Sequence, residues 1–224
     1  MAPSDTESIN TEDFESESES ESGRNGAYGK HVRIVDKDDI ALRTSSIEGA
    51  GKGVFCKRGI PARTILPFYA LIKKLSHVKD GTDHSYFMSV SYMNSNNEAR
   101  CIQTLIADGN PTLSCTKKLP RSLRAASYVN ESTKAAPNCV FVKNPCISKQ
   151  DVINSHREKK PIPVTLLVVP RDLQEGEELL TMYGPDYKRT YNVWIDKKGY
   201  KDKIVDLAHE IVDENKCQIA QYLK

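Results

Sequence analysis

From residue 30 onward the chain is a succession of short β-rich segments, and this succession limits the folds open to it. Pro, Gly and Asn separate the segments at short intervals, as in turns between strands. No helical segments alternate with them, which argues against a doubly wound nucleotide-binding fold and predicts a mainly β domain. The segments are "KHVRIV", "GKGVFC", "ILPFYALIKK", "SYFMSVSYM", "ARCIQTLIAD", "NCVFVKN" and "PIPVTLLVVP", of which the last has the continuous apolar run of a buried strand.

A glycine-rich stretch follows the first of these segments. "IEGAGKGVF", residues 47–55, places Gly49, Gly51 and Gly53 at alternate positions. So bare a backbone suits the close approach of a phosphate or a nucleotide-like cofactor, or only a tight turn. A dinucleotide fingerprint is disfavoured, because it needs Gly-x-Gly-x-x-Gly followed by a helix, and "VFCKRGIPA" is not a helix start.

The first 29 residues differ in composition from the rest of the chain. They alternate Ser and Glu and then become rich in Gly, with eight acidic residues and no Lys or Arg in residues 1–22. This composition cannot bury enough apolar surface to offset chain entropy, so it predicts a disordered acidic tail. Its serines precede acidic residues, as acidophilic kinases require. The tail is therefore either a plain solvating segment or a phosphorylated, regulated one.

The last residues, 191–224, are expected to form a helical segment. One long amphipathic helix or two short ones would pack an apolar stripe on the domain. A partner or self-association is the alternative use of this stripe. Its residues recur at helical spacing: Ile204, Leu207, Ala208, Ile211 and Val212, continued by Ile219 and Leu223.

The body of the chain is basic. Eight of the 30 acidic residues lie in residues 1–22, whereas all 32 Lys and Arg residues follow them. Such a body can meet nucleic acid, nucleosomes or an acidic surface, or its lysines only solubilise the protein.

Cysteine spacing and hydropathy exclude several classes of protein. The six cysteines form no Cys-x-x-Cys pair, so we expect reduced thiols and no local zinc site. No apolar run approaches the ~20 residues of a membrane span. The N-terminus has no basic n-region and no apolar core, so no secretory signal is expected.

Three separated stretches share their order and neighbours with one family. They are "GAGKGVF" (residues 49–55), "LRAASYVNESTKAAPNCVF" (residues 123–141) and "DLQEGEELLTMYGPDY" (residues 172–187). Together they resemble SET-domain protein lysine methyltransferases, in which a Gly-x-Gly strand start precedes Asn-His-Ser with a Pro-Asn, and then Gly-Glu-Glu-Leu with an aromatic-Tyr-Gly. The resemblance spans roughly residues 40–190. It implies a SET domain over residues 30–190, mainly β, with short sheets around a knot-like threaded C-terminal loop.

The resemblance implies S-adenosylmethionine as the cofactor. Gly51, Lys52 and Gly53 would lie against its methionine part, where a Cβ would collide with it. Asn130 would hold the cofactor through its amide, which both donates and accepts. Glu131 stands where the family has His; because that position serves the adenine mainly through its backbone, Glu131 is kept as a cofactor-binding residue. The inserted "TKAA" leaves the path of this loop open.

The same resemblance implies that Tyr183 is the catalytic tyrosine. A lysine substrate must arrive neutral to attack the methyl group, and most of the acceleration would come from alignment and desolvation. A phenol with a pKa near 10 is a poor base at neutral pH, so Tyr183 is assigned to orientation. Phe68, Tyr86 and Tyr187 are candidates for the walls of the lysine channel, and each is equally compatible with a place in the core.

The expected function is therefore S-adenosylmethionine-dependent methylation of a protein lysine. A histone tail is the preferred substrate, nucleosomal DNA is a further contact for the basic body, and the nucleus is inferred from that substrate, with the cytoplasm as the other option. The alternative is a catalytically inactive SET-like module for interaction or transcription regulation, favoured by Glu131 and by "TKAA". A nucleic-acid-binding β-barrel ranks last, since it rests on charge alone.

No metal is expected. Cys139 matches the family's cysteine after Pro-Asn, but its partners in a zinc segment are missing. The helix expected over residues 201–223 would close the lysine channel in place of such a segment.

Overall fold

A computed structural model of the chain describes residues 31–79, 82, 85–96, 98–184, 187, 189–196 and 199–223. The predicted acidic tail, residues 1–29, lies outside the described residues. Within the described part, more residues lie in strands than in helices, and the prediction of a mainly β fold is confirmed.

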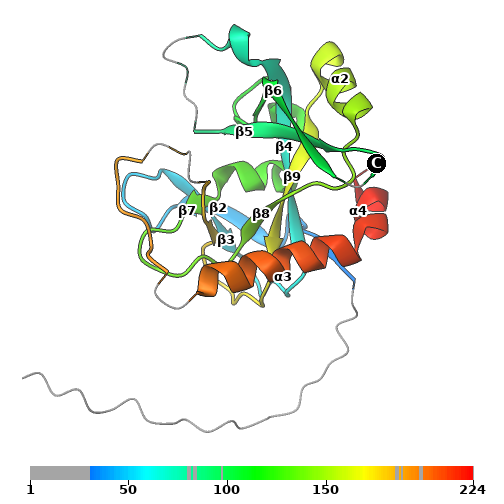
Figure 1. Cartoon of the computed structure of the whole chain (residues 1–224). Helices are drawn as coiled ribbons and strands as arrows, with labels where there is room; N and C mark the ends of the chain where they lie inside the picture. The colour runs from blue at the N-terminus through cyan, green and yellow to red at the C-terminus, as the bar shows by residue number, and fades with distance from the viewer. Residues whose placement is uncertain are drawn as a thin grey trace, which may run out of the picture. The chain divides into compact units, whose positions relative to one another are not determined.

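The largest sheet has six strands and is organised by β4 (Figure 1). The first part of β4 pairs with β9 and its last four residues pair with β6, so this one strand joins two halves of the domain. All of these pairs are antiparallel except β1 with β4. In spatial order the strands are β5 (Phe87–Met93), β6 (Ala99–Asp108), β4 (Thr64–Lys74), β9 (Ile162–Val169) and β8 (Val140–Lys143), with β1 (Arg33–Ile34) beside the start of β4.

Two small sheets and a set of helices complete the domain. β2 (Ile40–Thr44) and β3 (Lys52–Cys56) form an antiparallel hairpin, whereas β7 (Asn130–Glu131) and β10 (Leu180–Thr181) pair in parallel. The α-helices are α1 (Arg121–Arg124), α2 (Lys149–Glu158), α3 (Tyr200–Glu214) and α4 (Lys216–Tyr222), and the 3-10 helices are η1 (Leu75–His77), η2 (Thr116–Lys118) and η3 (Ala125–Tyr128).

β9 separates two hydrophobic cores. Leu167 and Val169 belong to the first core, which also takes up residues of β3, β4 and η3. Leu166 and Val168, pointing the opposite way, belong to a second core beneath α3 and α4. Val164, where the register with β4 shifts, also belongs to the first core. Because successive side chains of a strand face opposite sides, burial on both sides explains the continuous apolar run of this segment.

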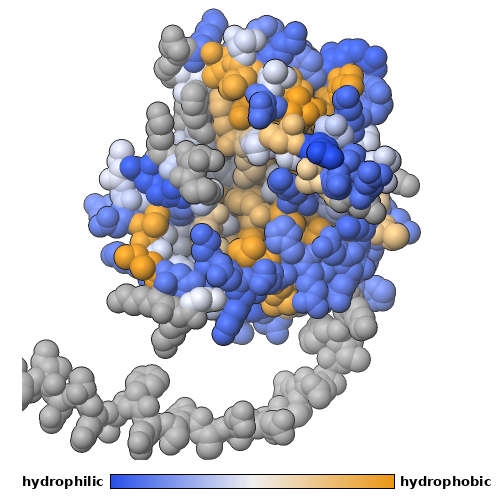
Figure 2. All heavy atoms as spheres, viewed as in Figure 1, coloured by the Kyte–Doolittle hydropathy of each residue, from blue (hydrophilic) through white to orange (hydrophobic). Residues whose placement is uncertain are grey.

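α3 and α4 cover the second core. Leu207, a member of the predicted stripe, is instead 39% exposed. The outward side of α3 is mostly hydrophilic (Figure 2). Gln218 of α4 accepts a hydrogen bond from the Val32 N–H at 3.0 Å and donates one to the Val32 carbonyl at 2.9 Å, so α4 also fixes the chain just before β1. The buried positions follow the predicted helical spacing: Ile204, Ala208, Ile211, Val212 and Ile219.

α2 is a helix that the apolar pattern does not predict. Of its apolar residues only Val152 is buried, so the helix has little periodic signal. It begins instead at a capping box, in which the Asp151 N–H donates to Ser148 Oγ at 3.1 Å and the Ser148 N–H donates to Asp151 Oδ2 at 2.8 Å. Among the helices that the structure describes, none combines the length and apolarity needed to cross a bilayer.

Candidate active site

The glycine-rich stretch forms the turn between β2 and β3. Gly49 and Gly51 have φ angles of +76° and +74°, in the region where a side chain strains the backbone. The Ser45 N–H donates to the Gly51 carbonyl at 2.8 Å and closes the turn. Apart from the glycine itself and its two chain neighbours, no heavy atom of the described residues lies within 4 Å of a Cβ built on either glycine. Backbone conformation is therefore what calls for glycine at these two positions.

Gly53 is required for a different reason. A Cβ at this position would lie 2.0 Å from Glu178 Oε1 and 3.4 Å from Asn130 Nδ2. The resemblance gave Gly53 its place through contact with the cofactor. In the structure, the nearest neighbour of its missing side chain is a carboxylate of the protein itself.

Glu178 is the centre of what we call the Glu178 cluster: Ser45, Ser46, Gly53, Asn130 and Glu178. The Glu178 residue is 8% exposed, and hydroxyl and amide groups surround its carboxylate. Ser45 Oγ donates to Oε1 at 2.6 Å, while Ser46 Oγ and the Ser46 N–H donate to Oε2 at 2.5 and 2.8 Å. These hydrogen bonds satisfy the buried carboxylate through uncharged donors alone.

Asn130 links this cluster to the glycine turn. Its Nδ2 donates to the Lys52 carbonyl at 3.1 Å and to Glu178 Oε1 at 3.5 Å. The predicted cofactor residues Gly53 and Asn130 therefore lie side by side, and the backbone of Lys52 joins them. The exposed side chain of Lys52 takes no part in these bonds.

The "PN" of the second motif fixes the backbone from Glu178 to the start of β10. Asn138 Nδ2 donates to the Glu178 carbonyl and its Oδ1 accepts from the Leu180 N–H, both at 2.8 Å. β10 itself pairs in parallel with β7, with Leu180 opposite Asn130. The second and third motifs, far apart in sequence, thus form one unit.

Glu131 is the centre of a second group, the Glu131 cluster: Glu131, Tyr183, Arg189 and Tyr191. The Glu131 residue is 6% exposed. Arg189 donates to it through Nε and Nη2, both at 2.6 Å. The Tyr183 N–H and the Tyr191 hydroxyl donate to the same carboxylate at 2.8 and 3.1 Å. The predicted cofactor-binding role of Glu131 was assigned to its backbone; its side chain is engaged by these three residues.

Tyr183 is held at both ends. Besides its N–H bond to Glu131, its hydroxyl donates to the Val129 carbonyl at 2.9 Å. Burial, followed by the nearby Tyr187, raises the pKa of Tyr183 well above its ordinary value. The phenol is therefore neutral at physiological pH, which agrees with an orienting role and not with proton abstraction.

The structure separates the three channel candidates. The Tyr187 ring centroid lies 4.7 Å from that of Tyr183, and Tyr86 is close enough to contribute to the raised pKa of Tyr183. Phe68 is 3% exposed and belongs to the first core. It packs edge-to-face on Phe141 at 5.8 Å, and a Cβ on Gly109 would lie 2.0 Å from its ring. Tyr86 and Tyr187 accompany Tyr183, whereas Phe68 is placed as a core residue.

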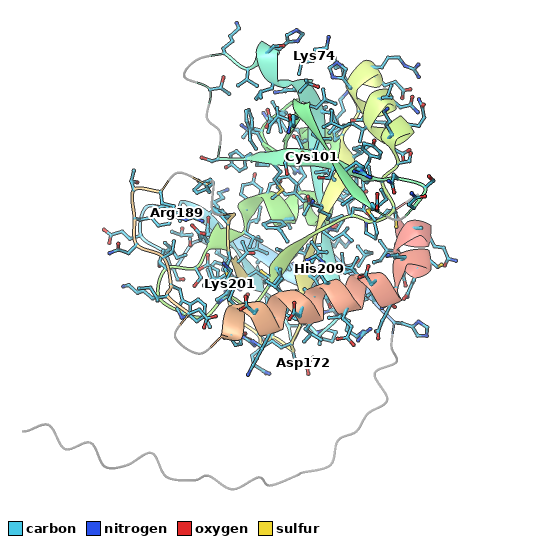
Figure 3. All side chains as sticks on the ribbon, viewed as in Figure 1. Lys74, Cys101, Asp172, Arg189, Lys201 and His209 are labelled. Atoms are coloured by element: carbon cyan, nitrogen blue, oxygen red, sulfur yellow. The ribbon has the colours of Figure 1, made fainter. Side chains whose placement is uncertain are left out.

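Sequence reasoning overlooked Glu178, Arg189 and Tyr191. Glu178 was quoted within "GEELL" without a role, and its burial is the missing signal. Arg189 and Tyr191 lie 58 and 60 residues from Glu131, and no local pattern marks their partnership. Figure 3 labels Arg189 on the segment that leads from β10 to α3.

Cys139 is a buried core residue whose Sγ donates to the Leu180 carbonyl at 3.2 Å. Within the described ranges, no three His, Cys, Asp or Glu side chains are grouped closely enough to hold a metal ion.

The mainly β fold, with parallel β7 and β10 bringing an asparagine motif and a tyrosine motif together, is of the SET type. The family model "SET domain" matches residues 51–184, more than half of the 224 residues. The chain therefore belongs to the SET domain family.

Two solved structures are similar to this chain at low identity. The methyltransferase domain of human PR domain-containing protein 2 is 20% identical, with 68% of this chain and 82% of that chain covered and a TM-score of 0.39. The SET domain of the RIZ1 tumor suppressor (PRDM2) is 15% identical, with 76% and 78% covered and a TM-score of 0.39. No curated protein matches the sequence.

Proposed function

We propose that this protein is an S-adenosylmethionine-dependent protein lysine N-methyltransferase. The observation that carries the proposal is the parallel pairing of β7 with β10. This pairing puts Asn130, the predicted cofactor residue, beside the strand that ends two residues before Tyr183, the predicted catalytic residue. Membership of the SET domain family supports the reaction class.

The residues around the glycine turn fit the polar end of the cofactor. Both described bonds of Asn130 use Nδ2, so its amide oxygen is the acceptor that it offers a ligand amine. The open space beside Gly51 lets a ligand approach the backbone of Gly51 and Lys52. Bound there, the cofactor supplies a methyl group on a sulfonium centre. Asn130, itself held by Glu178, would fix the position of that group.

Tyr183 would orient the attacking lysine amine. Because its hydroxyl proton is directed to the Val129 carbonyl, the lone pairs of its oxygen are available to accept from the amine or to contact the polarised methyl group. Tyr187, whose ring is tilted against it, would form one wall of the channel, and Tyr86 another. Neutral rings suit an alkyl amine and stabilise the cationic product through their faces.

The proposed substrate is a histone tail in the nucleus. The excess of Lys and Arg after residue 22 supports docking of the body on nucleosomal DNA. A catalytically inactive interaction module is the second candidate, and the replacement of the family's His by Glu131 favours it. Against it stands the engagement of the Glu131 carboxylate by Arg189, which neutralises the acid next to the site.

The test is transfer of labelled methyl from S-adenosylmethionine to nucleosomes and to each free core histone. We expect label on a histone and a loss of about 100-fold in Tyr183→Phe, since misalignment of the amine carries such a penalty. Tyr200→Phe is the matched control, because its hydroxyl also donates to a backbone carbonyl, that of Pro137 at 3.2 Å. Transfer that is equal in Tyr183→Phe and Tyr200→Phe would contradict the assignment. Label on none of these substrates would contradict the histone proposal.

A further inference from the structure

The Glu131 carboxylate is fully used. Oε1 accepts from the Tyr183 N–H at 2.8 Å and from Arg189 Nη2 at 2.6 Å. Oε2 accepts from Arg189 Nε at 2.6 Å and from the Tyr191 hydroxyl at 3.1 Å. Four donors match the approximately four lone-pair sites of a carboxylate, so the group is saturated by the protein.

Arg189 also donates hydrogen bonds to backbone carbonyls at and after Tyr183. Its Nη2 also donates to the carbonyls of Tyr183 and Gly184 at 3.1 and 3.0 Å, and its Nη1 donates to the Tyr187 carbonyl at 2.8 Å. Tyr183 is therefore held on one side through its N–H by Glu131 and on the other through its carbonyl by Arg189. The same guanidinium lies 5.5 Å from the centroid of the Tyr187 ring.

The pair is poorly exposed, which makes its two members dependent on each other. The Glu131 side chain is 4% exposed and that of Arg189 is 20% exposed. Removing one partner of such a pair leaves a charge that is neither paired nor hydrated. Lysine cannot replace the bidentate fork of Arg189, because an ammonium offers no planar pair of donors.

This arrangement reaches outside the part of the chain that matches the family. The match ends at residue 184, so Arg189 and Tyr191 lie beyond it. The segment that carries them, residues 189–196, is also fixed by the Trp194 N–H, which donates to the Ser132 carbonyl at 3.1 Å. Residues beyond the matched domain thus dock along β7 and the residue after it.

We propose that Glu131 and Arg189 form an ionic latch that positions Tyr183 and Tyr187 for methyl transfer and holds residues 189–196 along β7. Both are positioning residues, since they act through the tyrosines. α3 and α4 have their apolar faces buried in the second core, and their expected role in closing the channel stays a prediction. The proposal rests on the proposed function for its catalytic part only.

The experiment compares wild type with Glu131→Gln, Arg189→Met and the double variant in the full chain. Hydrogen exchange of the backbone amides, followed by mass spectrometry, measures whether the latch is formed and does not depend on methyl-transfer activity. We expect faster exchange over residues 183–184 and 189–196 in each single variant. Methyl transfer should show kcat lower by about 10- to 100-fold, with the cofactor Kd changed by no more than about twofold. The double variant should be no worse than the worse single one, because the two residues act as a unit.

Glu214→Gln is the matched control, since Glu214 also accepts from an arginine, Arg63, at 2.5 Å, but on α3. It should leave exchange over residues 183–196 and kcat unchanged. Unchanged exchange in Glu131→Gln would overturn the latch, as would single effects that add in the double variant. If wild type transfers no methyl but exchange rises as expected, the latch stands and the proposed function fails. If wild type is active and Glu131→Gln has normal kcat, the positioning role fails.

Discussion

The two sides of the candidate site each contain a buried glutamate, and the protein supplies the hydrogen-bond donors of the two in different ways. Glu178 accepts from serine hydroxyls, one backbone N–H and an asparagine amide, all of them uncharged. Glu131 accepts from a guanidinium in bidentate form. The first group lies on elements at or near the ends of the hairpin β2–β3 and of β10. The second depends on a segment that follows the domain match.

This difference assigns different tasks to the two clusters. The Glu178 cluster joins residues between Ser45 and Glu178 through uncharged donors, among them the amide of Asn130. The Glu131 cluster ties the tyrosine to residues that follow the domain, so its integrity depends on docking of residues 189–196. We therefore expect the tyrosine side to be the more sensitive to loss of a single residue.

Loss of Arg189 should have the largest effect on stability. Arg189→Ala leaves the Glu131 carboxylate buried without its counter-charge, which we expect to lower the free energy of unfolding by about 3 kcal/mol. Urea denaturation followed by circular dichroism measures the change. Glu214→Ala removes one member of a more exposed pair and should cost less than about 1 kcal/mol. Equal losses in the two variants would contradict the expected dependence of the buried Glu131 on Arg189.

Gly53→Ala tests how closely the Glu178 cluster is packed. Its Cβ would overlap Glu178 Oε1, which two other groups, Ser45 Oγ and Asn130 Nδ2, hold in place. We expect a loss of about 1–3 kcal/mol in the free energy of unfolding. In a Glu178→Ala background the same substitution should be nearly neutral, because the overlapping atoms are gone. A full loss in that background, measured by the same denaturation, would show that the conflict lies elsewhere.

Of the two clusters, alkaline pH should act on the Glu131 cluster. Burial, with a further contribution from Glu131, raises the pKa of Tyr191 to about 12. The unfolded chain ionises its tyrosines near pH 10. The folded state keeps this proton longer, so the stabilisation is complete below about pH 10 and is lost as the pH rises towards 12. Tyr191→Phe should flatten the fall in stability over this range, whereas Ser46→Ala should leave its slope unchanged. A slope unaltered in Tyr191→Phe would contradict the expectation.

The serines of the Glu178 cluster should show the smallest effects. Ser46→Ala removes one hydroxyl bond but keeps the backbone N–H bond of the same residue, and should cost about 1 kcal/mol. Ser45→Ala should cost more, because Ser45 Oγ also accepts from the Ile47 N–H at 3.1 Å. Thermal unfolding of the two variants gives the order. The reverse order would mean that Oε2 depends on the Ser46 hydroxyl more than the geometry indicates.

Much of the sheet was predictable because its signals are local. The segment "ARCIQTLIAD" corresponds to β6 with the same bounds, Ala99–Asp108, and the apolar run of "PIPVTLLVVP" marked β9. α2 escaped prediction, since a capping box identifies its start but only Val152 supplies a buried apolar contact.

The site was predictable only in part. Asn130 and Tyr183 were brought together by resemblance, since no property of either stretch alone predicts their pairing across β7 and β10. Glycine is required at position 53 for a reason other than the expected contact with the cofactor, because a Cβ there would overlap Glu178. Arg189 could not be found, because its partner Glu131 is 58 residues away and replaces the residue typical of the family.

Calorimetric titration of the full chain with S-adenosylmethionine tests the central claim most directly, because it needs no knowledge of the substrate. The account predicts one-site binding to wild type, unchanged in Tyr183→Phe, and at least about 10-fold weaker in Asn130→Ala, which loses the amide. No binding heat for folded wild type would contradict the account and favour an inactive interaction module. Equal binding by Asn130→Ala and wild type would show that the cofactor does not bind at the Glu178 cluster.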